Sequence, residues 1–170
     1  LKYDPKNPEW VGRDRFYLDP GHMAPMLYAQ LALIGKYSLE ELAQLRQWGS
    51  PTTGHPEFEV ARGVENTSGP LGQGHTFAVG AAIAAKFLAA HTGNPTFAKE
   101  TIYAYISDGG IQEEISQGAA RIAAVLGLDN LIMFYDSNDI QLSTETADVM
   151  NENTAAKYRA LGWEVLEING

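Results

Sequence analysis

Apolar residues recur with two different periods in the second half of the chain. Residues 101–106 and 131–135 are short apolar runs bounded by polar turn residues, which is typical of buried strands. Between them, residues 111–126 place apolar side chains at helical spacing and predict a helix. We expect another helix at residues 153–160, and the alternating run 163–168 predicts a final strand. Strands that alternate with helices predict an α/β domain, a parallel sheet flanked by helices and joined by right-handed crossovers.

The first half of the chain alternates between helical segments and irregular stretches. Residues 1–20 are rich in proline and predict an extended loop. Helices are expected at residues 25–34 and 38–48, and the second begins with the Ser-x-x-Glu signature of a capping box. Residues 49–74 are dense in Gly, Pro, Thr and Ser and predict a long loop, which in a compact domain is usually functional or disordered. An Ala-rich helix should follow at residues 76–91 and approach a neighbouring element closely.

Length, charge and cysteine content exclude several classes of function. The chain has 170 residues, enough for one domain with a buried core. Its 21 acidic and 12 basic residues give a net charge of −9, so neither nucleic acid nor an anionic membrane is expected as a partner. Without cysteine, disulfides and thiolate catalysis are excluded. The longest apolar stretch, residues 77–90, is too short to span a bilayer. Because the chain starts without methionine and stops after the last predicted strand, we expect a fragment of a longer polypeptide.

Polar residues that suit a metal ion follow two adjacent predicted strands. Asp108 follows the first and Asn138 the second, so their side chains can meet at one edge of a parallel sheet, where the carbonyl of Ile140 offers a third oxygen. Oxygen ligands in small number favour Mg²⁺, which would attract a phosphorylated ligand to an acidic chain. Gly109 allows close backbone approach at a helix N-terminus, and Glu113 is a candidate proton-relay or interface carboxylate. Ordinary turn and helix-start roles remain the alternative for these residues.

Glycines and histidines mark the long loop and its surroundings. Residues 69–74 lack the spacing of a dinucleotide or Walker A loop, so they form either a simple helix entry or a backbone wall facing a flat ligand. His22 and His55 stand in glycine- and proline-bounded loops, where each is either a surface residue or a donor to phosphates or hydroxyls. No zinc-ligand spacing is present. His75 and His91 lie near predicted helix ends and are assigned only capping or surface roles.

A series of these motifs, in this order, resembles the thiamine-diphosphate-binding amino-terminal domain of transketolases. The motifs are Gly21-His22, Thr53-Gly54-His55-Pro56-Glu57, residues 69–74, Asp108-Gly109 and Asp136-Ser137-Asn138. The resemblance covers nearly the whole chain and implies that residues 1–170 are a diphosphate-binding domain fragment with part of the thiamine-diphosphate-binding fold. Transketolases of the pentose phosphate pathway transfer a two-carbon ketol unit between sugar phosphates. The resemblance further implies a cytoplasmic homodimer that uses thiamine diphosphate with Mg²⁺ or Ca²⁺.

The resemblance assigns roles around the metal by position. It implies that Asp108, Asn138 and the carbonyl of Ile140 are metal ligands. It also implies that Gly109, Asn138 and His22 contact the cofactor diphosphate.

The resemblance assigns further roles along the cofactor and at the subunit interface. Gly69, Pro70 and Leu71 correspond to backbone contacts along the cofactor. His55 corresponds to a catalytic histidine that hydrogen-bonds the substrate, and Glu113 to an acid at the subunit interface, which we also place in the catalytic group. The homodimer is expected to form through the cofactor site.

Some features depart from the family pattern. Ser107 stands where the family usually has glycine, His75 where it has an apolar residue, and Gly118 where many members have a second interface glutamate. The glutamate that activates the aminopyrimidine belongs to the pyrimidine-binding domain, outside this chain, as does the carboxyl-terminal domain, so the fragment alone should be inactive.

Two alternatives stay open. One is another thiamine-dependent enzyme, such as a deoxyxylulose-phosphate synthase or a dehydrogenase component, although the His22 and His55 loops favour a transketolase. The other is a non-catalytic amino-terminal subunit of a split transketolase.

Overall fold

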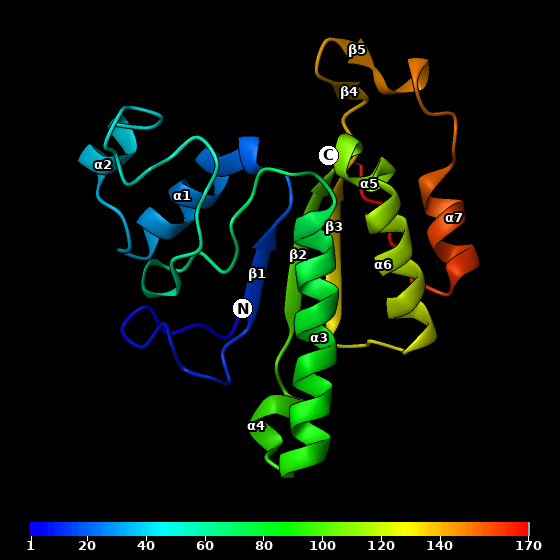
Figure 1. The fold of residues 1–170 in the computed structure, drawn as a ribbon, viewed down its shortest axis with the longest axis horizontal. Coiled ribbons are helices and arrows are strands. Elements are labelled where there is room, and N and C mark those ends of the chain that lie inside the picture. Colours follow the sequence, from blue (N-terminus) through cyan, green and yellow to red (C-terminus); the bar gives the residue numbers. More distant parts are fainter. Residues whose placement is uncertain (170) are drawn as a thin grey trace.

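Three parallel strands form the central sheet of the computed structural model, which describes residues 1–169 (Figure 1). They are β1 (Arg15–Leu18), β2 (Ile102–Ser107) and β3 (Leu131–Asp136), and they stand in the order β1-β2-β3. Both outer strands run parallel to β2, which confirms the predicted parallel sheet flanked by helices. The carboxyl ends of all three strands therefore lie at the same edge of the sheet.

β1 corrects the prediction that residues 1–20 form only an extended loop. The strand has four residues and begins with a charged one, so it shows little of the alternation that marks a strand. It forms because β2 offers its backbone edge: Tyr17 pairs with Ala104, and Leu18 is fully buried against the first helices. Tertiary contact decided this element, because its local pattern is too short to predict it.

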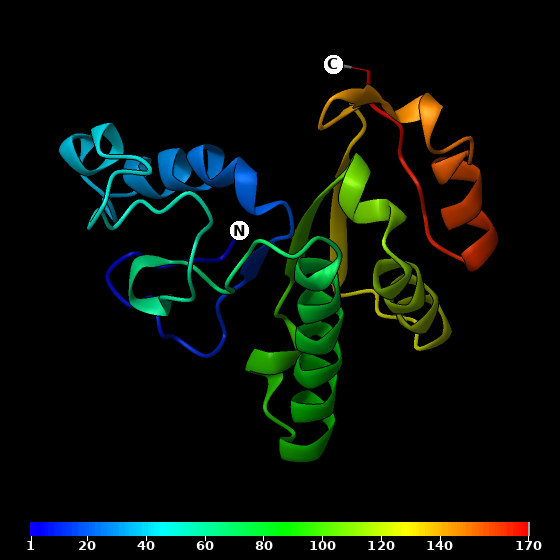
Figure 2. The ribbon, with the colours of Figure 1, turned by 45° about the horizontal axis from the view of Figure 1, so that its top comes forward.

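Two helices cover one face of the sheet (Figures 1 and 2). α3 (Gln73–Thr92) is the predicted Ala-rich helix, slightly longer at both ends, and α6 (Glu114–Val125) lies beside it. The small side chains of α3 let its backbone approach the strands closely, as expected. The core between these helices and the sheet is built from buried apolar residues, among them Tyr17, Ala78, Val79, Ala82, Ile102, Ala104, Ala119 and Leu131.

A second apolar cluster lies on the other side of β1, where α1 (Ala24–Leu33) and α2 (Leu39–Ala43) pack with the long loop (Figure 1). The predicted helix at residues 38–48 has its capping box but is wrong in length. It ends early because Arg46 adopts a left-handed conformation (φ 63°) and donates its backbone N–H to the Thr52 carbonyl over 2.9 Å. The chain therefore turns away from the helix axis.

The helix predicted at residues 111–126 is divided into two. α5 (Asp108–Gln112) begins as soon as β2 ends, and α6 starts after Glu113, whose ψ of 133° is extended. This break changes the direction of the chain directly beside the sheet edge. Asp108 consequently lies in the first turn of a helix and not in a turn before one.

The carboxyl-terminal segment corrects another prediction. α7 (Thr154–Leu161) forms as expected, but residues 163–168 pair with no strand in the part of the chain that the structure describes. Trp163 packs on α6 instead and donates its indole N–H to the Ala120 carbonyl over 2.9 Å. Alternation alone does not make a strand, because the ladder requires a partner backbone.

The remaining elements are short. β4 (Ile140–Gln141) and β5 (Thr144–Glu145) form an antiparallel hairpin that follows β3 (Figures 1 and 2). Among residues 1–169 no helix combines the length and the apolar character needed to cross a bilayer. The bounds of the other short elements are η1 (Gly21–Met23), η2 (Val60–Arg62), α4 (Pro95–Ala98) and η3 (Thr146–Asp148).

Candidate functional site

Asp108 lies at the carboxyl end of β2, where its carboxylate is almost fully buried, with 2% of the residue exposed. The Tyr135 hydroxyl donates to Asp108 Oδ1, and the backbone N–H of Asn138 donates to Oδ2 over 3.2 Å. Burial, and then the hydrogen bond to Asp108, raises the pKa of Tyr135, so the phenol stays protonated and acts as the donor. The structure thus brings Asp108 and Asn138 together from two neighbouring strand ends.

The loop after β3 brings Ile140 close to the same place. Asn138 Oδ1 accepts the backbone N–H of Ile140 over 3.2 Å, and the intervening Asp139 has a left-handed φ of 64°. A short polar side chain that bonds its own backbone two residues on is an Asx turn, and this one reverses the chain into β4. Gln112 Nε2 donates to Gln141 Oε1 over 2.7 Å and ties β4 to α5. That Asp108, Asn138 and Ile140 hold a metal stays a prediction.

Ser107 and Gly109 form the start of α5. Ser107 Oγ accepts the backbone N–H of Gly110 over 3.5 Å, so the serine that departs from the family pattern serves as the cap of this helix. A Cβ added at Gly109 would lie 2.9 Å from Leu71 Cδ1. The Gly-rich loop therefore lies directly against the start of α5, and a larger residue at position 109 would require the Leu71 side chain to move.

The start of the Gly-rich loop gathers a second group of the predicted residues. A Cβ at Gly21 would lie 2.8 Å from the backbone nitrogen of Gly69 and would also meet the His55 ring. His22 follows on η1, and both histidines are exposed to solvent. Exposure leaves their ring nitrogens accessible to a ligand. Pro70 is also exposed in the loop, which links this group to Leu71 and Gly109.

A short chain of hydrogen bonds from α1 holds the loop that contains His55. The Tyr28 hydroxyl on α1 bonds Thr53 Oγ1 over 3.0 Å, and Thr53 Oγ1 lies 2.6 Å from the carbonyl oxygen of His55. Asn66 bonds both the backbone N–H and the carbonyl of Leu18, and Ser68 Oγ donates to the same carbonyl over 2.7 Å. These bonds order a loop that contains little secondary structure of its own.

Asp19 is the residue at this edge that the sequence reasoning did not single out. It follows β1 directly, it is fully buried, and its carboxylate accepts the backbone N–H groups of Gly72 and His75 over 3.0 and 3.3 Å. Burial is the main influence on the Asp19 carboxyl and raises its pKa, while these hydrogen bonds oppose the rise. The only sequence signal for Asp19 is an acid immediately after an apolar run, and that run is too short to predict β1.

His75 is buried, whereas Glu113 lies at the surface. The surface or capping role assigned to His75 is wrong: the side chain is fully buried, and its Nδ1 lies 2.7 Å from Ser116 Oγ on α6. Burial lowers the pKa of His75 to about 4, so the ring is neutral at pH 7. Glu113 is exposed, and a Cβ at Gly72 would lie 2.8 Å from Glu113 Cβ. His91 is exposed in the last turn of α3, as expected.

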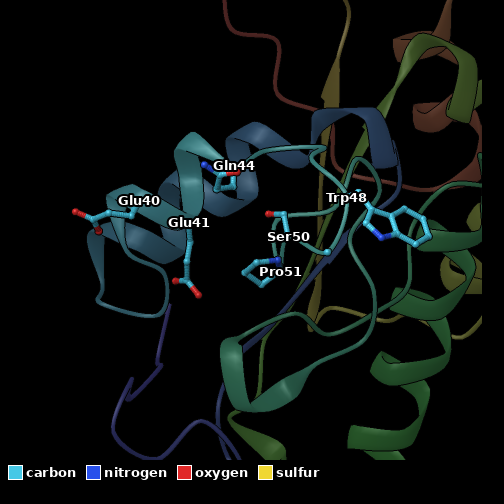
Figure 3. A pocket seen from close by; sticks show the side chains of 7 residues that line it. Glu40, Glu41, Gln44, Trp48, Ser50 and Pro51 are labelled. Atoms are coloured by element: carbon cyan, nitrogen blue, oxygen red, sulfur yellow. The ribbon is translucent and has the colours of Figure 1, made fainter.

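A shallow pocket elsewhere on the surface does not include this edge of the sheet. Figure 3 shows it between α2 and the following loop, where its lining includes Glu40, Glu41, Gln44 and Trp48. It contains none of the predicted site residues. The candidate site is therefore defined by the strand ends and the Gly-rich loop.

A parallel α/β fold with glycine-lined backbone and buried carboxylates beyond the carboxyl ends of its strands is typical of domains that bind phosphorylated cofactors. The family model described as "Transketolase, thiamine diphosphate binding domain" matches residues 1–170. The chain therefore belongs to the transketolase family, as its thiamine diphosphate binding domain, which confirms the resemblance found in the sequence.

Individual relatives agree with the family model. The chain is 46% identical to the transketolase of Mycobacterium leprae over 178 residues, covering 100% of this chain and 25% of that protein. It is 47% identical to transketolase 1 of Saccharomyces cerevisiae over 171 residues, covering 99% and 25%. A crystal structure of transketolase from Campylobacter jejuni superposes with a TM-score of 0.91 at 43% identity, covering 98% of this chain and 26% of that one. The chain thus spans about a quarter of the length of these proteins.

Proposed function

We propose that this chain holds the metal and the diphosphate of thiamine diphosphate in an enzyme that moves a two-carbon ketol unit between sugar phosphates. The observation that carries the proposal is the meeting of Asp108 and Asn138 from two strand ends, directly beside Gly109 and the Gly-rich loop. Membership of the transketolase family supports the same conclusion.

Asp108, Asn138 and the carbonyl of Ile140 would hold Mg²⁺ or Ca²⁺. The described residues hold no cluster of three or more histidines and acids suited to a metal, so the ion would depend on one carboxylate with amide and carbonyl oxygens. That donor set, completed by water and diphosphate oxygens, suits a hard cation. Tyr135 and the backbone of Asn138 fix the direction of the Asp108 carboxylate before an ion arrives.

The remaining residues fit a phosphorylated, elongated cofactor. Gly109 and His22, with Asn138, would contact the diphosphate, and the backbone of Gly69, Pro70 and Leu71 would line the cofactor from there. Gly109 carries no side chain, so a ligand can approach its backbone closely, which supports this fit. When bound, thiamine diphosphate supplies the carbon nucleophile for ketol transfer.

His55 would bind and orient the substrate hydroxyls near the reacting carbon, and Glu113 would contribute a carboxylate at the subunit interface. The activating glutamate and the pyrimidine-binding and carboxyl-terminal domains would come from outside this chain. The complete protein would be a cytoplasmic homodimer of the pentose phosphate pathway, joined through the cofactor site.

The test is ketol transfer by the complete protein, with xylulose 5-phosphate as donor and ribose 5-phosphate as acceptor, in the presence of thiamine diphosphate and Mg²⁺. We expect turnover that disappears when either the cofactor or the metal is omitted. A folded protein that binds the cofactor but transfers nothing would favour the non-catalytic subunit. Condensation of pyruvate with glyceraldehyde 3-phosphate would instead indicate a deoxyxylulose-phosphate synthase.

The His55→Ala variant tests the division of roles within the site. We expect kcat to fall by at least about tenfold at saturating cofactor, because the contact is made to the reacting part of the substrate. The dissociation constant of thiamine diphosphate should stay within about twofold, and the exposed His91→Ala should change neither quantity. Weakened cofactor binding with normal kcat would move His55 to the diphosphate group.

A further inference from the structure

Asp19 is a buried carboxylate between two backbone segments of the candidate site. It directly follows β1, so it lies at the same sheet edge as Asp108, which directly follows β2. The first backbone nitrogens of α3 lie on one side of it, because Gly72 and His75 donate to its two oxygens. α5 lies on the other side, where a Cβ at Gly110 would collide with Asp19 Oδ2. The Asp19 carboxylate thus lies between the Gly-rich loop and α5 and contacts both of them.

The carboxylate replaces a cap that α3 lacks. The N-cap residue of α3 is Gly72, which has no side chain to accept the free N–H groups of the first turn. Asp19 accepts two of them from 53 and 56 residues away in the sequence. A carboxylate is also favoured at a helix N-terminus by the helix dipole. This capping bond fixes where the Gly-rich loop ends and the helix begins.

No cation forms an ion pair with Asp19 among residues 1–169, and the charged side chain that acts on its carboxyl, Glu113, is another acid. A buried charge that is held only by backbone hydrogen bonds is costly, because burial removes its hydration. The backbone N–H groups of Gly72 and His75 stabilise the Asp19 carboxylate, and the absence of a side chain at Gly110 leaves room for it. The loop and the carboxylate therefore depend on each other for their positions.

We infer that Asp19 is a positioning residue for cofactor binding, which sets the Gly-rich loop against α5 at the separation that the thiamine diphosphate requires. The inference rests on the proposed function, because Gly69, Pro70 and Leu71 are the backbone contacts that the loop would present. Asp19 itself does not touch the reacting atoms. Its effect passes through Gly72 to the loop and through Gly110 to α5.

The same strand provides a matched control. Asp14 stands just before β1, at the opposite edge of the sheet, and is also buried. Its carboxylate likewise accepts two backbone N–H groups, from Lys2 over 2.6 Å and Thr101 over 3.0 Å, and it also pairs with the Lys2 ammonium over 3.2 Å. Asp14→Asn and Asp19→Asn each replace a buried carboxylate that accepts two backbone N–H groups, and Asp14→Asn in addition removes an ion pair, so it is the more severe change for the fold. Only the second change adjoins the candidate site.

The experiment measures the dissociation constant of thiamine diphosphate with Mg²⁺, kcat at saturating cofactor and amide hydrogen exchange, all on the complete protein. In Asp19→Asn the amide can accept only one of the two N–H groups, so we expect about tenfold weaker cofactor binding. Exchange at Gly72 and His75 should become faster, and kcat at saturation should stay within about twofold. Asp19→Ala should weaken binding further, whereas Asp14→Asn should leave cofactor affinity unchanged.

Equal cofactor affinities for the unsubstituted protein and Asp19→Asn would overturn the inference while leaving the proposed function intact. If the unsubstituted protein did not bind thiamine diphosphate, the proposed function would fail, and the inference with it. Asp19→Ser keeps a small acceptor and replaces Asp19→Asn if that variant does not fold. Failure of both to fold, with Asp14→Asn folded, would show that the role of Asp19 is in folding alone and would also overturn the inference.

Discussion

The buried charged residues at the two edges of the sheet differ in their partners. At the amino edge, Arg13 forms a two-pronged ion pair with Glu65, with bonds of 2.7 and 2.9 Å, and Arg15 pairs with Glu100. At the carboxyl edge, Asp19 and Asp108 are buried without an ion pair among the described residues and are held by neutral donors.

This difference indicates that the two edges of the sheet have different roles. At the amino edge each buried charge has a partner from the chain itself, so that edge is complete and stabilises the fold. At the carboxyl edge the carboxylates accept only neutral N–H and O–H donors, and the proposed function would give Asp108 a cation from solution. If the comparison is right, substitutions at the amino edge should change stability, and those at the carboxyl edge should change ligand binding.

The largest effect is expected from Arg13→Ala. The substitution leaves the buried Glu65 with only its longer contact to Arg15 Nε at 3.8 Å, and because breaking one side of a buried pair costs about 3–5 kcal/mol, we expect a loss of unfolding free energy of about 3 kcal/mol. Chemical denaturation of the complete protein measures this loss. The affinity of the folded variant for thiamine diphosphate should be unchanged, and a selective loss of affinity without loss of stability would contradict the comparison.

Asp108→Ala should have the next largest effect, on binding. Without its carboxylate, a diphosphate would face an acidic domain with no bridging cation, so we expect Mg²⁺-dependent cofactor affinity to fall by about 100-fold or more. A calorimetric titration of thiamine diphosphate in the presence of Mg²⁺ measures it. Asp14→Ala at the other edge serves as the control. Unchanged affinity in Asp108→Ala would remove Asp108 from the metal ligands.

Acid sensitivity should arise at His75. Because burial lowers its pKa to about 4, below the ordinary value of 6.5, the unfolded state binds the extra proton as pH falls through this range. Stability is therefore greatest above pH 6.5 and should fall by about 2 kcal/mol between pH 7 and pH 5 because of this group.

The variant His75→Leu should remove this part of the pH dependence, and the exposed His91→Leu should not. Thermal unfolding at the two pH values measures both. The same pH dependence in His75→Leu and in the unsubstituted protein would place its origin elsewhere.

The smallest effect is expected from Tyr135→Phe. It removes the hydroxyl that donates to Asp108 and leaves the ring in place, so cofactor affinity should fall by about tenfold through a less well oriented carboxylate. Tyr158→Phe is a matched control, because the buried Tyr158 hydroxyl has no hydrogen-bond partner in the described structure. Equal affinities in the two variants would show that the orientation of Asp108 does not depend on Tyr135.

The sequence by itself determined β2 and β3, their parallel pairing and most of the candidate site. The apolar runs ending at Ile106 and Tyr135 are long enough to be strands, and each is followed by polar residues, so Asp108 and Asn138 were predictable as neighbours. Helices with strong local patterns, such as α3 and α7, also formed where expected. These features depend on short-range periodicity, which is fully present in the chain.

Only the tertiary structure decided the elements and roles that depend on distant partners. β1 exists because β2 offers a free backbone edge, and residues 163–168 are no strand because nothing pairs with them in the described structure. His75 is buried because α6 covers it, and Asp19 matters because two N–H groups more than fifty residues away point at it. A local pattern records the preferences of a residue, but burial, pairing and capping are properties of the neighbours that the fold brings to it.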